Sequence, residues 1–401
     1  MDLNAFVDDS MGSLVPIHGT DTFDGPWEHR AFVPSPLPER APELDGTAYM
    51  AVANARAALA ALDSTARQLP NPQLLRYPTL RREAQSTSAL EGTYAPLQSV
   101  LTADTDRPST VAMTEILNYV RMAEFGFTEA LRGRATSLSL LNSLQGILMQ
   151  GTHLEEESGR VRESQVVIGR RDNAPPGELP VRASRFVPSP PGLPLEANLR
   201  DLADWMQVDR RTSIDPVVAT AMAHYQFETL HPYRDGNGRL GRFLIVLQLL
   251  HEGVLAEPTL TVSPWFEARR SEYYDRLLAV STDGAWNGYV TFFARGLDAS
   301  AKQTLRQLNA LVKVQGELKE QIRGSNLRAD SYHSLVDLSI ATTSFTVKAA
   351  ADSLQLSPQR VRDLVGALVE LNVLRPLNEN SRNRRFYAPK VIEVLLDDEV
   401  A

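Results

Sequence analysis

Two apolar segments with a glycine-rich loop between them constrain the fold of this chain more than any other feature. The first segment, VVATAMAHYQFETL, directly follows Asp215-Pro216, and the second runs from 240 to 252 before Gly253. Asp followed by Pro is typical of a helix N-terminus, and Gly of a helix C-terminus. We therefore expect apolar helices over 216–230 and 240–252, joined by a short loop.

The rest of the chain is also predominantly helical in pattern. Its 401 residues suggest two to three domains, and 43% hydrophobic with 22% charged residues is ordinary for a folded protein. Apolar residues at helical spacing predict five further helices. These helices cover 47–62, 80–90, 110–131, 137–149 and 195–206. Helices continue after 252 to about residue 323.

Two segments depart from the helical pattern. Residues 1–45 are rich in Pro, Asp and Gly, which predicts a weakly ordered lead-in or strap. Residues 165–168 and 184–187 are β-prone, and a turn-forming stretch, RDNAPPG, lies between them. This arrangement predicts a β-hairpin over residues 165–187, called the flap below.

The last 75 or so residues predict a separate unit after a hinge at 324–326. Two short helices, 347–354 and 359–371, precede a basic hairpin tip at 381–387, which is a winged-helix layout. Residues 329–390 contain 8 basic and 6 acidic residues, a balance of only +2. DNA-binding domains are usually more basic. DNA binding, protein docking and dimer formation therefore stay open for this unit.

Several classes of protein are excluded by composition. The chain has no cysteine, which excludes disulfide scaffolds, cysteine nucleophiles and thiolate metal sites. A net charge of −8 does not fit a general nucleic-acid coat. No apolar run is long enough for a membrane helix, and the acidic N-terminus does not resemble a secretion signal. We expect a cytoplasmic protein without membrane partners.

The loop HPYRDGNGRLGR, residues 231–242, combines groups suited to phosphate chemistry. Gly236 and Gly238 permit backbone conformations in which N–H groups converge, and the next helix adds its positive N-terminal end. Arg239 and Arg242 lie three residues apart and can project from the same side of the first turn. The loop therefore predicts an anion-binding cradle.

Two further residues of the loop add chemistry to this cradle. Asp235 supplies a hard oxygen suited to Mg²⁺, and His231 can act as a base near neutral pH. Together with the cradle they suit phosphoryl or nucleotidyl transfer. The glycines at 236, 238 and 241 also match a dinucleotide-binding pattern. That pattern needs a preceding strand, whereas the preceding segment predicts a helix.

The loop resembles the core motif of the Fic family, HPFx[D/E]GNGRxxR, with Tyr233 in place of Phe. The resemblance implies an all-helical core with a flap, and transfer of AMP from ATP to a hydroxyl of a target protein docked at residues 165–187. It implies that His231 deprotonates the hydroxyl, that Asp235 binds Mg²⁺ and that Arg242 grips the γ-phosphate. The remaining nucleotide-binding residues it implies are Gly236, Asn237, Gly238, Arg239, Leu240 and Gly241.

A second match lies about 140 residues upstream. Residues 86–92, STSALEG, resemble the inhibitory motif of the family, [S/T]xxxE[G/N], at Thr87, Glu91 and Gly92. The resemblance implies that Glu91 pairs with Arg242 and blocks the γ-phosphate position, so that ATP binds unproductively. It places the chain among members inhibited by an N-terminal helix (class II), here about residues 80–92.

The resemblance extends to a candidate adenine pocket. Tyr273 and Tyr274 resemble part of that pocket, with Tyr274 as the expected contact. Members often have Asn seven residues later, where this chain has Ser281. His224, on the helix before the loop, is expected to be packed rather than catalytic.

These observations predict a mainly α protein with three parts. They are an N-terminal helical region with the inhibitory helix (1–105), a Fic-type core with a β-hairpin flap (106–323) and a small winged-helix domain (324–401). The favoured function is an autoinhibited protein adenylyltransferase that uses ATP and Mg²⁺. Removal of AMP at the same site, and a winged-helix transcriptional regulator with a nucleotide-sensing core, are the alternatives. The target, the modified residue type and the oligomeric state, including a homodimer, stay open.

Overall fold

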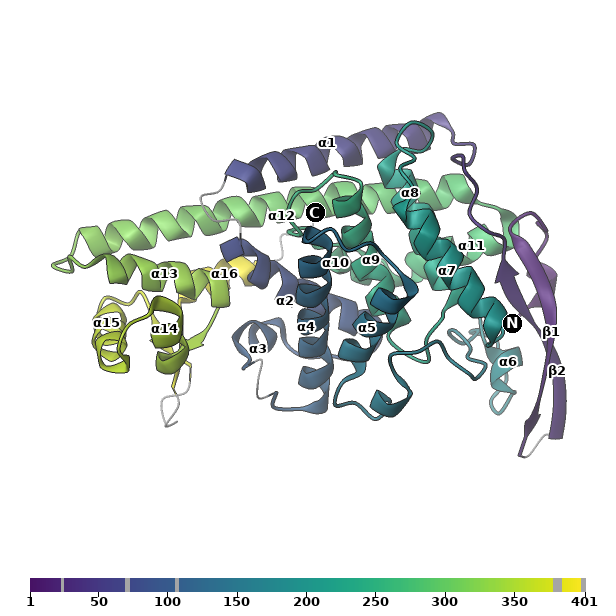
Figure 1. Cartoon of the computed structure of the whole chain (residues 1–401), viewed down its shortest axis with the longest axis horizontal. Coiled ribbons are helices and arrows are strands. Elements are labelled where there is room, and N and C mark those ends of the chain that lie inside the picture. The colour runs from purple at the N-terminus through teal and green to yellow at the C-terminus, as the bar shows by residue number, and fades with distance from the viewer. Residues whose placement is uncertain (23–24, 69–72, 105–107, 378–383, 398–401) are drawn as a thin grey trace. The chain divides into compact units, whose positions relative to one another are not determined.

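The computed structural model describes residues 1–22, 25–68, 73–104, 108–377 and 384–397, and helices dominate them (Figure 1). The helices up to the loop are α1 (Gly46–Gln68), α2 (Gln73–Leu90), α3 (Leu97–Thr102), α4 (Val111–Leu131), α5 (Leu138–Met149), α6 (Pro180–Ala183), α7 (Leu193–Gln207) and α8 (Pro216–Leu230). Those after it are α9 (Asn237–His251), α10 (Ser263–Ala268), α11 (Arg270–Asp283), α12 (Trp286–Arg323), α13 (Asp330–Thr342), α14 (Val347–Leu354), α15 (Pro358–Glu370) and α16 (Pro389–Leu396). The predicted mainly α class is confirmed.

The chain forms two compact units from interleaved segments. The first unit contains Met1–Leu59, Arg121–Leu255 and Trp265–Ala299, and the second contains Ala60–Val120, Ala256–Pro264 and Ser300–Ala401. The predicted functional domain limits at 105 and 323 stay predictions. None of the helices in the described ranges is long and apolar enough to cross a membrane.

The core of the first unit is built on α8 and α9, the two predicted apolar helices. Every residue of α8 except Glu228 is buried, and so are the first thirteen residues of α9. Helices that are hydrophobic on all sides fold only when other elements surround them. Helix α4 is one of the elements that cover α9. At Gly126 of α4 the two helices approach closely, since a Cβ there would lie 2.5 Å from Cζ of Phe243 on α9.

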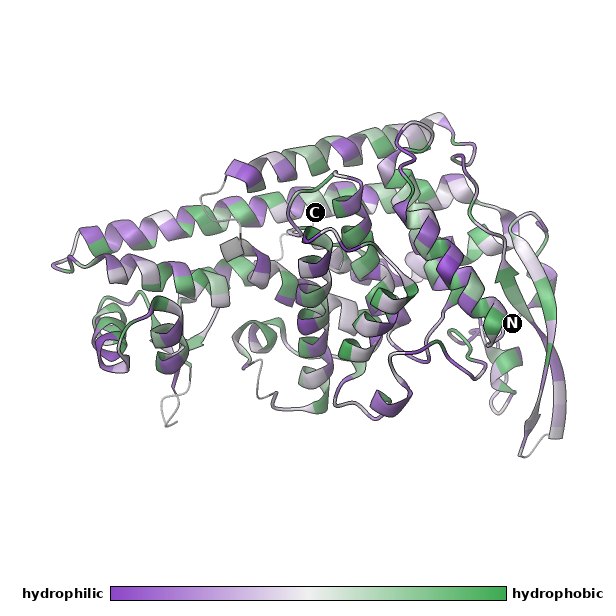
Figure 2. Ribbon diagram, in the orientation of Figure 1, coloured by the Kyte–Doolittle hydropathy of each residue, from purple (hydrophilic) through white to green (hydrophobic). Residues whose placement is uncertain are grey.

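The long helix α12 shows the opposite pattern. Figure 2 shows hydrophobic and hydrophilic residues alternating along its ribbon. Its buried apolar residues recur at intervals of three, four or seven, as an amphipathic helix requires. From Leu297 onward they are Leu297, Ala301, Leu308, Leu311, Val314, Leu318 and Ile322, whereas the first turns of the helix are buried more fully.

The N-terminal segment is not a weakly ordered lead-in, nor is it helical. Strands β1 (Gly12–Asp21) and β2 (Gly25–Pro34) pair antiparallel over their whole length, with Gly12 opposite Pro34. The prolines suggested a loop, but each strand of a two-stranded ribbon is an edge strand, where proline is tolerated. The ribbon is anchored at Phe32, whose N–H donates to the Val187 carbonyl at 2.9 Å.

The flap keeps the predicted antiparallel course but not the predicted strands. One isolated bridge joins Ile168 and Phe186, with N–H to carbonyl distances of 2.9 and 3.1 Å, and it is the only β-bridge between the two predicted strand segments in the described residues. The one-turn helix α6 lies immediately before the second of these segments. Prolines at 175, 180 and 188 remove donors that a longer ladder would need.

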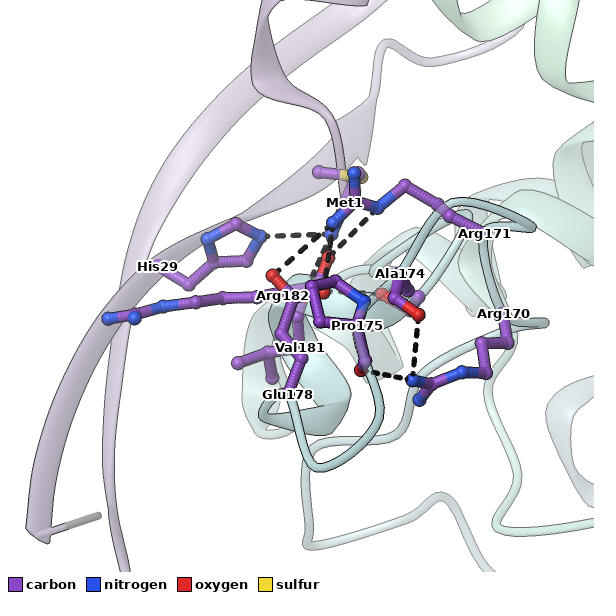
Figure 3. A network of polar contacts seen from close by, with 10 residues as sticks. Met1, His29, Arg170, Arg171, Ala174, Pro175, Glu178, Val181 and Arg182 are labelled. Atoms are coloured by element: carbon purple, nitrogen blue, oxygen red, sulfur yellow. Dashed lines mark hydrogen bonds and ion pairs between the residues drawn. The ribbon is translucent and has the colours of Figure 1, made fainter.

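Side chains and the chain terminus hold the flap instead of a ladder (Figure 3). The Met1 amino group donates to the carbonyls of Val181 at 2.6 Å and Arg182 at 2.7 Å. Arg170 donates to the Pro175 carbonyl at 2.6 Å, and Arg171 pairs with Glu178 at 3.2 Å. Burial, with the Arg171 charge second, lowers the pKa of the Met1 amino group to about 6.

The second unit contains the C-terminal elements in the order α13, β3 (Phe345–Thr346), α14, α15, β4 (Arg375–Pro376), β5 (Arg385–Tyr387) and α16. The strands form an antiparallel sheet in the order β3-β5-β4. Helices predicted at 347–354 and 359–371 are confirmed, and Ser357 caps α15 by accepting from the Arg360 N–H at 3.2 Å. Residues 381–383 of the predicted basic tip lie outside the described residues. The winged-helix identification stays a prediction.

Helix α2 of the second unit contains the predicted inhibitory motif. Thr87 is buried within it, and Glu91 is exposed immediately after its last residue, Leu90. Gly92 has φ +92°, and the Thr93 N–H donates to the Ser88 carbonyl at 2.9 Å, so the helix ends in a glycine cap. The motif therefore places Glu91 at a fixed helix end.

Candidate active site

His231 occupies the turn that ends α8. Its backbone is left-handed, with φ 49° and ψ 60°, and its N–H donates to the Phe227 carbonyl at 3.0 Å. Its Nδ1 lies 3.3 Å from the Glu228 carbonyl, which can only accept, so Nδ1 holds the proton of the neutral ring. Nε2 is then the basic nitrogen of the ring.

The Asn237 side chain closes the loop on itself. Its Oδ1 accepts from the Tyr233 N–H at 2.8 Å, and its Nδ2 donates to the Tyr233 carbonyl at 2.8 Å. Asn237 was predicted to hold phosphate, yet both ends of its amide are used by the loop. Its backbone N–H, at the first position of α9, is the group of Asn237 that suits binding an anion.

Tyr233, where the family pattern has Phe, is buried and donates from its hydroxyl to Asn142 Oδ1 of α5 at 2.9 Å. Replacing Tyr233 with Phe should lower the free energy of unfolding by about 1 kcal/mol, the usual net value of such a bond. The transfer activity proposed below should not change, because the hydroxyl faces α5. Thermal unfolding of the Phe variant, Asn142→Ala and the double variant tests this. If the losses in free energy of unfolding of the two single variants add up to that of the double variant, the hydrogen bond between Tyr233 and Asn142 contributes nothing.

Asp235 and Gly236 form the entry to α9. Asp235 Oδ1 accepts from the Gly236 N–H at 2.5 Å, and its Oδ2 lies 3.3 Å from Nη2 of Arg239. Gly236 has φ +82°, and a Cβ there would lie 2.8 Å from Leu148 Cδ2, so only glycine fits. Gln145, which the sequence did not single out, donates to the Asp235 carbonyl at 3.1 Å. The loop is therefore held from α5.

The first turns of α9 concentrate positive charge. Arg239 and Arg242 are 2% and 0% exposed, close to the positive end of the helix dipole. Leu240 is fully buried, so only its backbone can meet a ligand. Gly241 packs against α8, since a Cβ there would lie 2.2 Å from Glu228 Oε1. Glycine and leucine here serve helix packing while the arginines supply the charge.

His224 and Tyr273 are packed, as predicted for His224. His224 Nδ1 lies 3.1 Å from the Gly241 carbonyl and must donate to it, so Nε2 accepts from the Tyr273 hydroxyl at 2.7 Å. Tyr273 is fully buried, whereas Tyr274 is half-buried with Arg270 5.8 Å from its ring. Ser281 is buried and 2.9 Å from the Tyr225 hydroxyl. Tyr274 is thus the more accessible of the two tyrosines.

Burial, with the Arg242 charge second, lowers the pKa of His224 to about 3, against an ordinary 6.5. Between these pH values the unfolded chain binds a proton that the folded chain does not. The free energy of unfolding should therefore fall with falling pH from 6.5, by up to about 1.4 kcal/mol per pH unit from this group. Thermal midpoints of His224→Asn measured from pH 7 to pH 5 should decline less steeply than those of the parent. Parallel declines would contradict the assigned neutral state.

The site and fold match one protein family. A model described as "Fic/DOC family N-terminal" matches residues 49–128, and one described as "Fic/DOC family" matches residues 135–249, which include the loop. Among curated relatives, "Protein adenylyltransferase fic-1" of Caenorhabditis elegans is 32% identical over 147 residues, 37% of this chain and 24% of that protein. "Protein adenylyltransferase Fic" of Drosophila willistoni is 28% identical over 173 residues, 41% of this chain and 30% of that protein.

Solved structures agree at the level of the fold. A Fic family protein from Desulfovibrio desulfuricans G20 superposes with a TM-score of 0.54 at 22% identity, covering 87% of this chain and 98% of that one. Residues 134–508 of C. elegans Fic-1 give 0.51 at 21% identity, covering 65% of this chain and 74% of that one. The helical core with its histidine-led loop is that of a Fic domain. Over residues 49–128 and 135–249 the chain has the N-terminal and Fic segments of the Fic/DOC family. It spans about a quarter to a third of the length of these two curated relatives.

Proposed function

We propose that this protein transfers AMP from ATP to a hydroxyl side chain of a target protein. The observation behind the proposal is the loop at the start of α9, where a basic histidine, an acidic residue and two buried arginines surround a helix N-terminus. The similar proteins named protein adenylyltransferase support it. The target, or the protein itself, would dock at the flap.

The proposed step is a displacement at the α-phosphorus. The hydroxyl oxygen attacks the α-phosphorus, the bond to the bridging oxygen of the β-phosphate breaks, and pyrophosphate leaves. Nε2 of His231 takes the hydroxyl proton. The guanidiniums of Arg239 and Arg242 and the N–H groups of the first turn of α9 hold the phosphate oxygens. Tyr274 is the proposed adenine contact.

The donor set suits Mg²⁺ bound together with ATP. Asp235 is the carboxylate of the loop, its side chain is 45% exposed, and Mg²⁺ commonly binds one or two carboxylates together with substrate phosphates. No group of three or more candidate ligands from His, Cys, Asp and Glu occurs among the described residues. When bound, the ion would neutralise charge on the phosphates.

We further propose that Glu91 inhibits this reaction by pairing with Arg242, with Thr87 and Gly92 fixing the helix end on which it stands. Sequence supports this pairing, since residues 86–92 match the family's inhibitory motif. A carboxylate and a γ-phosphate compete for the same guanidinium fork. Removal of AMP at the same site is the alternative that a retained Glu91 favours. The cytoplasmic location and a homodimer stay predictions.

The position of the labelled phosphate in ATP shows which group is transferred to protein. The Glu91→Gly protein is incubated with Mg²⁺, a lysate and ATP labelled either at the α- or at the γ-phosphate. AMP transfer should label protein from α-labelled ATP only, and mass spectrometry should find an added AMP. Label from γ-labelled ATP would show phosphorylation instead. Absence of label from both, with bound ATP, would favour the nucleotide-sensing alternative.

The order of elements from α13 to β5 favours a second role for the C-terminal part. The part has a helix, a short strand, two helices joined by a turn and a strand pair, an order that supports the predicted winged helix. We propose that this part docks a macromolecule, with DNA as one candidate. Selection from a pool of short random duplexes with the whole protein tests the DNA option. Enriched sequences whose binding weakens with salt would support it.

A further inference from the structure

Arg162 connects the base of the flap to the loop that contains His231. It is 4% exposed and lies just before the flap. Its Nε donates to the His231 carbonyl at 2.8 Å, and its backbone N–H donates to the Pro232 carbonyl at 2.9 Å. Its Nη1 donates to the Ser164 carbonyl at 3.0 Å, and its Nη2 donates to the Ser189 carbonyl.

These acceptors come from three separate places in the chain. Ser164 directly precedes the flap, Ser189 follows its last residue by two, and His231 is the C-cap residue after α8. Gln165 adds a second link across the flap base by donating to the Pro188 carbonyl at 2.9 Å. One guanidinium therefore fixes both ends of the flap and the backbone of His231 to a common point.

The side-chain type explains why this contact is specific. Arginine presents donors in a planar fork, so Nε, Nη1 and Nη2 can reach three carbonyls in different directions at once. Burial lowers the pKa of Arg162 to about 10, which still leaves it charged at neutral pH. A charge on these carbonyls strengthens each hydrogen bond. The Arg162 hydrogen bond to the His231 carbonyl also supports the left-handed backbone of His231, a conformation that residues with a Cβ rarely adopt.

We propose that Arg162 is a positioning residue that sets the His231 imidazole relative to a chain docked on the flap. The inference rests on the proposed function, since the docked chain supplies the hydroxyl that His231 deprotonates. Arg162 itself would touch neither ATP nor the target. Loosening it should let flap and histidine move independently, while the phosphate site on α9 keeps its shape.

The test compares Arg162→Met and Arg162→Lys with the matched control Arg160→Met, all in the Glu91→Gly background. Arg160 is exposed and two residues away. For Arg162→Met we expect kcat for AMP transfer to fall about 10- to 100-fold with an unchanged KM for ATP. Arg162→Lys should recover part of kcat, and Arg160→Met should match the parent.

Amide hydrogen exchange supplies a readout that does not depend on activity. In Arg162→Met we expect amide exchange to become faster in both the flap, residues 165–187, and the loop, residues 231–236. The interior of α8 should stay protected, which verifies that the variant is folded. An unchanged kcat, or faster exchange in the flap without the loop, would overturn the proposal. If the Glu91→Gly parent transfers no AMP, the proposed function fails, and the exchange result still decides whether Arg162 couples the two segments.

Discussion

Replacing His231 with alanine in the Glu91→Gly background should lower the rate of AMP transfer by about 10²- to 10⁴-fold, the usual contribution of a general base. The neutral ring keeps its proton on Nδ1 through the Glu228 carbonyl, so Nε2 is the nitrogen that accepts the hydroxyl proton. Alanine leaves no group to accept it. Initial rates with α-labelled ATP, with ATP affinity measured separately, test this. Affinity should change little, since the phosphates are assigned to α9.

The control for this variant is His153→Ala, because His153 is exposed and its loss should leave the rate unchanged. A His231→Ala variant within a few-fold of the parent would show that another group accepts the proton.

The helices and loop of the site were predictable because their information is local. The segments on either side of the loop are apolar at nearly every position, and Asp215-Pro216 marks the start of α8. The one shift is that α9 begins at Asn237 and not at 240. Glycine at 238 disfavours a helix in isolation, but the two hydrogen bonds of Asn237 to Tyr233 fix the first turn.

The strand segments were less predictable because their hydrogen-bond partners are distant. Phe32 of β2 donates to Val187, and Ile168 pairs with Phe186, so long-range pairing decides which backbone groups are satisfied. Local composition, rich in proline and glycine, gave the opposite indication for β1 and β2. In the flap the same prolines limit pairing to a single bridge, so a β-prone pattern overestimated its strands.

The residues that support the site had no sequence signal. Asn142, Gln145 and Arg162 lie 69 to 91 residues before their partners in the loop. None of them belongs to a spaced motif, and lone polar residues in a helical protein are usually solvated. Their role follows only from the fold, which brings α5 and the flap base against the turn after α8.

The Glu91→Gly variant should transfer AMP about 100-fold faster than the parent, with most of the change in kcat. Adenine and α-phosphate contacts do not require Arg242, so ATP should bind nearly as well to either protein. In-line attack requires the α-phosphate and leaving group to be aligned, and a displaced γ-phosphate spoils that alignment. Titrations of ATP binding alongside initial rates separate the two effects.

Two further variants test whether competition for Arg242 is the cause of inhibition. Glu91→Gln keeps the size of the side chain but removes its charge, so it should activate nearly as well as glycine if competition for a guanidinium is the cause. Arg242→Ala in the Glu91→Gly background should stay slow, because the proposed γ-phosphate clamp is then missing. Arg242 is fully buried near the N-terminus of α9, so a folding check by circular dichroism accompanies this variant. If Glu91→Gly acted only by tightening ATP binding, or if the folded double variant were as fast as Glu91→Gly alone, the proposed competition between Glu91 and the γ-phosphate for Arg242 would be wrong.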